Sequence, residues 1–292
     1  MLSPMDLAAL YDREKFPRHV IEALAGIPLD YLEQLAFIRQ QKNSPTPWER
    51  AGILLPISFL EIEQTDKDRP SEYVVLLNKR SKRVQQAGDL CAPGGGVHPF
   101  LDRITQQILR MGLFPWTKGL AFDAGKKRGE TAYKTILFFL GNALRESWEE
   151  IRLSPFNLEF LGSLPSYRLQ SRRWIIFPVV GRVRHPWQPK LSPEVDKIIS
   201  IPLRTFFQPE NHAFYSLEVP EALVAQGIPN TWAFPCLVYD ADGAEEILWG
   251  ATYAVMRSFL GFIFDQPLPS PDGRRVIQRK LMANYLSGDE EI

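Results

Sequence analysis

Apolar residues in the first 45 positions recur at mixed spacings of three and four, which is typical of amphipathic helices. Pro17 and Pro28 interrupt the pattern, so we expect several short helices rather than one long one. The apolar positions are Leu7, Leu10, Val20, Ile21, Leu24, Tyr31, Leu32, Leu35 and Ile38. We therefore divide the chain into an N-terminal helical extension, residues 1–45, and a domain at residues 46–292.

The pattern changes at Ala51, where short runs rich in Val, Ile and Leu begin. Residues 51–62 and 72–80 predict buried strands, and the polar segment between them predicts a solvated loop. Residues 90–100, LCAPGGGVHPF, predict a glycine turn, because glycine adopts backbone angles that other residues resist. Taken alone, this turn is equally well explained as an ordinary loop.

A long helix is predicted at residues 130–153, while residues 103–130 fit no regular element. The buried face of that helix is expected to contain Ile136, Leu140, Ala143, Ser147 and Ile151. Further strands are predicted at 159–167, 174–183, 197–203 and 236–240, with a last helix at 249–263. This mixture of strands and helices predicts an α/β protein.

Composition excludes several classes of function. Of the 292 residues, 34 are Lys or Arg and 34 are Asp or Glu, so the chain has no overall field that would attract nucleic acid or an anionic membrane. The longest apolar run is far shorter than a membrane span, and the charged start argues against a signal peptide. Two cysteines are too few for a disulfide framework, so we expect a reducing, cytoplasmic location.

Candidate chemistry is concentrated in residues 142–153, NALRESWEEIRL, where three carboxylates fall within five residues. Glu146 and Glu150 are four apart and share one helix face, with Glu149 beside them. Like charges at this spacing repel, whereas Mg²⁺ or Mn²⁺ favours clustered oxygen ligands. Arg145 is expected to neutralise part of the cluster and to orient one carboxylate. The alternative is a solvated helix face, which is the commoner explanation of such a run.

Residues 145–153, RESWEEIRL, resemble the second half of the Nudix box, G-x5-E-x7-R-E-U-x-E-E-x-G-U, where U is bulky and apolar. Upstream, residues 76–95 resemble the additional signature of the coenzyme A pyrophosphatase branch of that family, roughly LLTxRS, a basic position and GxxxFPGG. The matching positions are Leu76, Leu77, Arg80, Ser81, Gly88, Pro93, Gly94 and Gly95. The resemblance covers residues 51–265, interrupted by an insertion at 103–140.

The resemblance implies a Nudix-type α/β/α sandwich with a mixed sheet, preceded by the helical extension and carrying the insertion before the box helix. It implies that Glu146 and Glu150 bind Mg²⁺ or Mn²⁺. Glu149 would add a ligand or polarise a metal-bound water, and Arg145 would support the catalytic site.

Substrate contacts are also implied. Arg80 and Arg83 are candidate phosphate ligands, although a solvated strand end explains them too. Glu194, in a later loop, is a candidate base or extra ligand, and a plain surface carboxylate explains it equally well. Backbone N–H groups of the glycine turn are expected to face phosphate oxygens; these glycines are Gly94, Gly95 and Gly96.

The chain departs from the family pattern at several positions. Counted from Gly95, the first box glutamate falls on Leu101, and Asp102 is adjacent but shifted. Arg152 stands where the pattern has a helix-ending glycine, and Ala92 stands where the signature has phenylalanine. The missing first glutamate slightly favours a module that binds nucleotides without turning them over.

The resemblance therefore implies a metal-dependent hydrolase that cleaves the pyrophosphate of a nucleoside diphosphate linked to X, with coenzyme A or a derivative as the first candidate. Hydrolysis of another nucleotide, or a catalytically weak nucleotide-binding module, are the alternatives. The expected partner is a small nucleotide, not nucleic acid or membrane, and a homodimer is left open.

The insertion carries apolar side chains that something must cover: the core, a second subunit or a substrate. They are Phe114, Trp116, Leu120 and Phe122. We expect the insertion to form a lid or a dimer contact beside the site. Its basic run at 126–128 is explained either as a solvated loop or as a contact for an anionic substrate.

Overall fold

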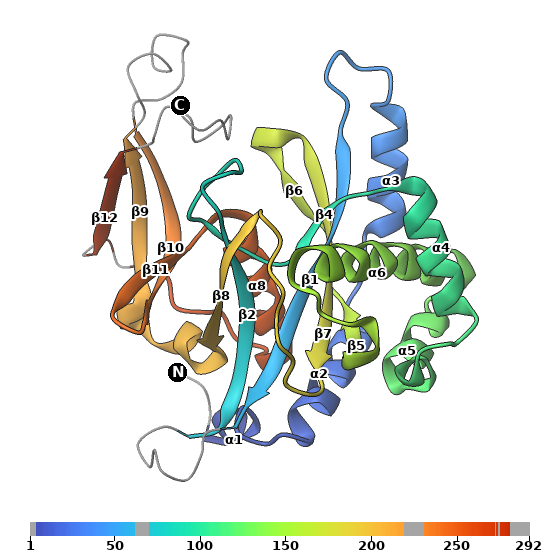
Figure 1. The fold of residues 1–292 in the computed structure, drawn as a ribbon, viewed down its shortest axis with the longest axis horizontal. Helices are drawn as coiled ribbons and strands as arrows, with labels where there is room; N and C mark the ends of the chain where they lie inside the picture. The colour runs from blue at the N-terminus through green and yellow to red at the C-terminus, as the bar shows by residue number, and fades with distance from the viewer. Residues whose placement is uncertain (1–3, 62–69, 219–230, 272, 274, 281–292) are drawn as a thin grey trace.

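The computed structural model describes residues 4–61, 70–218, 231–271, 273 and 275–280. Three helices come first: α1 (Pro4–Ala9), α2 (Lys15–Gly26) and α3 (Tyr31–Gln40) (Figure 1). Pro28 separates α2 from α3, as predicted. Pro17 does not break a helix: it lies in the first turn of α2, where a proline's missing N–H is not needed.

The main sheet has eight strands in the order β3-β2-β1-β7-β5, with β4 beside β1, β6 beside β7 and β8 beside β2. β1 and β7 are parallel and the other pairs are antiparallel, so the sheet is mixed as expected. The strands are β1 (Glu49–Leu60), β2 (Glu72–Arg80), β3 (Leu90–Cys91), β4 (Gly94–Gly96), β5 (Leu158–Ser163), β6 (Tyr167–Leu169), β7 (Trp174–Val183) and β8 (Val195–Pro202). The expected loop at 65–72 lies mostly outside the described residues.

A second, four-stranded sheet has the order β11-β10-β9-β12. Its strands are β9 (His212–Glu218), β10 (Thr231–Ala241), β11 (Ala244–Leu248) and β12 (Val276–Lys280). The sequence pattern predicted part of β10 and missed the other three. Glu246 of β11 joins the two sheets, because its buried carboxylate accepts bonds from Lys79 at 2.9 Å and Lys197 at 2.8 Å.

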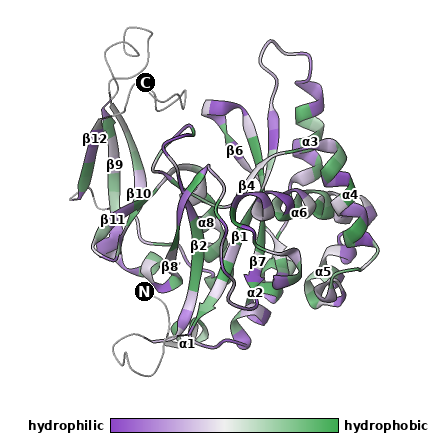
Figure 2. Cartoon of the chain, viewed as in Figure 1, coloured by the Kyte–Doolittle hydropathy of each residue, from purple (hydrophilic) through white to green (hydrophobic). Residues whose placement is uncertain are grey.

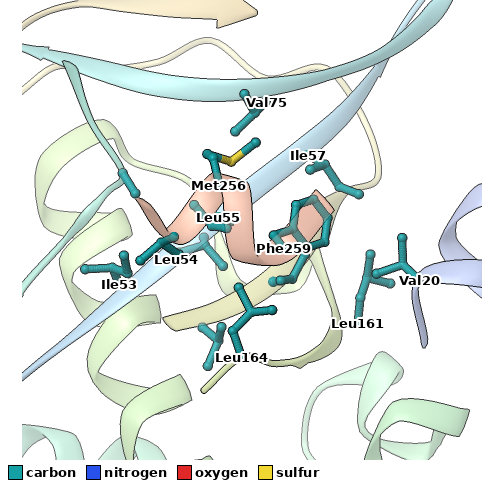
Figure 3. Close-up of a cluster of buried hydrophobic side chains, with 14 of the residues drawn as sticks. Val20, Ile53, Leu54, Leu55, Ile57, Val75, Leu161, Leu164, Met256 and Phe259 are labelled. Carbon is teal, nitrogen blue, oxygen red and sulfur yellow. The ribbon is translucent and has the colours of Figure 1, made fainter. Parts of the chain in front are cut away.

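Helices cover both faces of the main sheet. The long helix α6 (Glu130–Ile151) lies on one face and α8 (Gly250–Phe264) on the other (Figure 1). Met256 and Phe259 of α8 point into the cluster that contains Leu55 and Val75 of the strands (Figure 3). In Figure 2 the hydrophobic colour follows these central strands. The predicted α/β/α layering and mixed sheet are confirmed, and the five residues predicted for the inner face of α6 are buried.

The insertion is helical, which corrects the interpretation of residues 103–130 as irregular. It folds as α4 (Pro99–Arg110), a short helix η1 (Pro115–Lys118) and α5 (Leu120–Lys127). α4 packs on α6 at Gly141, where a Cβ would come within 3.2 Å of the α4 backbone. Phe114, Trp116 and Phe122 are buried in the protein's own core, whereas Leu120 is exposed. The protein's own core therefore covers three of these four apolar side chains, and Leu120 is left uncovered.

The N-terminal helices share that core. Leu10, Phe16 and Val20 are fully buried, and the Tyr31 hydroxyl donates to the Pro178 carbonyl of β7 at 2.9 Å. Further 3-10 turns occur at η2 (Pro155–Asn157), η3 (Gln170–Arg172), η4 (Leu203–Phe207) and η5 (Pro209–Asn211). In the described part of the chain, no helix is long and apolar enough to cross a membrane.

Candidate active site

Arg145 is the centre of the charged cluster on α6. Its guanidinium pairs with Asp102 at 2.8 Å, Glu146 at 2.8 Å and Glu149 at 3.0 Å, and it donates to the Gly96 carbonyl at 3.1 Å. Burial alone would lower the pKa of Arg145, but the bond to Asp102 and the other carboxylates outweigh it and raise that pKa. Arg145 therefore stays charged and fixes the position of its partners.

Asp102 lies one residue after Leu101, the position that counting from Gly95 gives for the first acid of the box. It is fully buried on α4, where it accepts from Arg145, from the His98 backbone N–H at 2.7 Å and from the Asn142 amide at 3.1 Å. Counted from Gly96 instead of Gly95, the G-x5-E pattern places its acid at Asp102. Counting from Gly95 gives Leu101 instead, and the bond between Asp102 and Arg145 favours the count from Gly96. His98 has a structural role as the N-cap of α4.

Glu146 lies directly against the backbone of β4. A Cβ on Gly95 would meet the Glu146 carboxylate at 2.7–2.8 Å, so any other residue here would displace that carboxylate from its present position. Burial raises the pKa of Glu146, Arg145 opposes this shift, and Glu149 and Asp102 add to it. The predicted glycine turn is thus a short strand, and one of its functions is to admit this carboxylate.

Glu150 is the most strongly perturbed carboxylate of the site. It accepts from the Asn78 amide of β2 at 2.8 Å and from the Gly94 backbone N–H. Burial raises the pKa of Glu150 to about 8, with Glu146 and Glu194 adding to the shift and Gly94 and Arg80 opposing it. Two acidic groups on one helix face are therefore held where their ionised forms destabilise each other.

The other predicted residues lie around this pair. Glu149 is half exposed and turned to Arg145. Glu194 is exposed, and its backbone carbonyl accepts from the Ser81 N–H at 2.9 Å. The neighbouring Ser192 donates its N–H to the Glu150 carbonyl at 2.8 Å, which ties the Glu194 loop to the end of α6.

The residues predicted to bind phosphate do not form one cluster as the carboxylates do. Arg80 lies near Glu150 and donates from Nε to the Gln85 carbonyl at 2.7 Å, while the Arg83 side chain is exposed. In β4 the Gly94 N–H is directed at Glu150 and the Gly96 carbonyl at Arg145. The basic run at 126–128 is partly structural, because Arg128 donates to the Leu24, Ala25 and Ile27 carbonyls at the end of α2.

Two asparagines of the site were missed by sequence reasoning. Asn142 is fully buried and joins three elements: it accepts from the Gly52 N–H at 2.6 Å and donates to the Gly96 carbonyl and Asp102. Asn78 holds Glu150 from the sheet side. A signal for Asn78 was available, because LLNKRS differs from the signature LLTxRS at this position.

The residues present fit a hard divalent cation. Among the described residues, no group of three or more His, Cys, Asp or Glu side chains stands ready to bind a metal. Glu146 and Glu150 nevertheless supply the one or two carboxylates that Mg²⁺ takes when waters and phosphate oxygens complete its shell. Burial is the main cause of the raised pKa of both acids, and a bound cation would favour their ionised forms.

No protein-family model and no curated protein matches this sequence. Several solved structures are similar at low identity. A Nudix hydrolase from M. smegmatis, RenU, is 14% identical over 54% of this chain and 72% of that chain, with a TM-score of 0.34. The C. elegans Ap4A hydrolase in a binary complex is 16% identical over 53% of this chain and 81% of that chain, with a TM-score of 0.32.

A Nudix hydrolase from Nitrosomonas europaea is 12% identical over 78% of this chain and 80% of that chain, with a TM-score of 0.31. These likenesses concern the fold alone. At such TM-scores they support no inference about activity, which has to rest on the residues of the site.

Proposed function

We propose that this protein is a divalent-cation-dependent hydrolase that cleaves the pyrophosphate of a nucleoside diphosphate linked to another group. The observation that carries the proposal is the pair Glu146 and Glu150, two largely buried acids on one helix face with raised pKa values. A bound Mg²⁺ or Mn²⁺ would stabilise charge on the pyrophosphate and lower the pKa of a coordinated water. Coenzyme A or a derivative is the first candidate substrate, on the strength of the upstream signature.

The chain's own residues have separate tasks in this proposal. Arg145 holds Glu146 and is held in turn by Asp102, so the first carboxylate is fixed before substrate arrives. The Gly94 N–H keeps Glu150 in place from the β4 side. Glu194, on a loop tied to α6, is the residue that we propose would take a proton from the attacking water or add a ligand.

Asp102 also bears on the alternative of a binding module without turnover. That alternative drew support from the apparent loss of the first acid of the box. Because Asp102 pairs with Arg145 at 2.8 Å, an acid partner for this arginine is present after all. We therefore favour an active enzyme over a module that only binds.

Turnover of a substrate panel tests the proposal. Coenzyme A, NADH, ADP-ribose and dinucleoside polyphosphates are incubated with the protein and Mg²⁺ or Mn²⁺, and the nucleotide products are measured: adenosine 3′,5′-bisphosphate from coenzyme A, and nucleoside mono-, di- or triphosphates from the other compounds. We expect cation-dependent hydrolysis of at least one compound, and a loss of two or more orders of magnitude in Glu146→Gln and in Glu150→Gln. Measurable binding with no turnover of any compound would leave only the binding module.

A further inference from the structure

Asn78 is a buried polar residue in the middle of a hydrophobic strand. It is 1% exposed on β2, where its register partners are Cys91 on β3 and Ile198 on β8. Its amide nitrogen donates to Glu150 Oε2 at 2.8 Å. Its amide oxygen is buried and has no hydrogen-bond partner among the described residues. Half of this side chain is therefore satisfied and half is not.

The unpaired oxygen opposes folding. A buried acceptor without a donor destabilises a protein by about 1–3 kcal/mol, and native structures contain few of them. Turning the amide over would not help, because the oxygen of Asn78 would then face the carboxylate oxygen of Glu150. The orientation with an unpaired oxygen is thus the better of the two, and it is set by Glu150.

The bond to Glu150 serves a purpose that an apolar residue could not. Glu146 and Glu194 repel Glu150, and the Asn78 amide and the Gly94 N–H are donors that hold its carboxylate against this repulsion. A lysine or arginine at position 78 could hold it, but its positive charge would compete with a cation for the same oxygens. An amide N–H holds the carboxylate without adding charge, and it leaves other lone pairs free.

We propose that Asn78 is a positioning residue that keeps Glu150 beside Glu146 for a divalent cation, and that its unpaired oxygen is the structural cost of this role. The inference rests on the proposed function for the identity of the site and extends it to a residue outside the box helix. Partners that orient a ligating carboxylate typically change metal affinity by about 10–100-fold when removed.

Asn78→Leu tests the proposal, because leucine has the same branched skeleton of heavy atoms as asparagine and has no polar atoms. Two quantities are measured on the full chain: the Kd for Mn²⁺ by titration calorimetry, and the free energy of unfolding by urea in EDTA. We expect the Kd to rise about 10–100-fold, while the free energy of unfolding changes by no more than about 1 kcal/mol, since an unpaired oxygen and a hydrogen bond are removed together.

Two variants supply the controls. Leu77→Val changes the adjacent, fully buried residue of the same strand, so it should lower stability by about 1 kcal/mol and leave the Kd unchanged. Glu146→Gln should abolish the same binding event, which identifies it as the event at this site.

The outcomes separate this inference from the proposed function. A Kd for Asn78→Leu within threefold of wild type overturns the role of Asn78, whatever the turnover. An equal rise in Kd for Leu77→Val and Asn78→Leu also overturns it, because general loosening would then explain both. Mn²⁺ binding that is weakened only in Asn78→Leu and Glu146→Gln supports the role even if no compound of the panel is hydrolysed.

Discussion

Replacing Asp102 with asparagine replaces one oxygen of a fully buried carboxylate with an NH₂ group of nearly the same size. The carboxylate accepts from Arg145, from the His98 N–H and from the Asn142 amide. An asparagine has one acceptor oxygen. If that oxygen faces Arg145, the new NH₂ group faces two donors; if it is reversed, the NH₂ group faces the guanidinium.

The expected loss is about 3 kcal/mol. A hydrogen bond to a charged group contributes about 1.5–3 kcal/mol, and removing one partner of a buried ion pair costs about 3–5 kcal/mol. Arg145 keeps Glu146 and Glu149, so its charge is not left alone, and the lower end of that range applies. For a domain of this size, the melting temperature should fall by about 6–12 °C.

Urea unfolding followed by circular dichroism in EDTA measures this loss without any contribution from bound metal. Glu149→Gln is the control: it removes another partner of Arg145, but from a side chain that is 51% exposed, so a change below about 1 kcal/mol is expected. If Asp102→Asn proves as stable as wild type within 1 kcal/mol, the buried carboxylate does not hold α4 to α6, and the reasoning fails.

Three further changes follow from the structure. Glu194→Gln should lower kcat more than it raises KM if the side chain acts in the transition state. A wild-type rate would mean that Glu194 is a surface carboxylate without a catalytic role. Arg152→Gly should stabilise the protein by about 0.5–1 kcal/mol in urea unfolding, because this residue ends α6 with a left-handed φ of 55°; a loss of stability would mean that contacts of the arginine outweigh the strain. Glu246→Gln should cost about 1–2 kcal/mol at pH 7. Burial raises the pKa of Glu246, but the bonds to Lys197 and Lys79 outweigh it and lower the pKa below 4.5. Wild type therefore gains this stability above pH 4.5 and loses it as the pH falls through the lowered pKa, so the difference between the two proteins should shrink in acid; a constant difference from pH 7 to pH 3.5 would contradict this assignment.

The local parts of the structure could be predicted from the sequence. The face of α6 with Ile136, Leu140 and Ile151 is buried as its period indicates. Glu146 and Glu150 share a face because they are four residues apart on a helix. Both results depend on helix geometry, which is the same wherever a helix forms. Strands β1 and β2 were likewise predicted from runs of Val, Ile and Leu.

Only the tertiary structure decided what surrounds that helix. Asp102 and Arg145 are 43 residues apart, and Asn78 and Glu150 are 72 apart. No helix or strand period links such positions, and counting the motif from Gly95 rather than Gly96 moves its acid position from Asp102 to Leu101. The covering of Phe114, Trp116 and Phe122 by the core was equally a matter of packing between distant segments. Local helix geometry decides which side chains share a face. Burial, charge pairing and unpaired polar groups depend on which distant segments of the chain pack against that face.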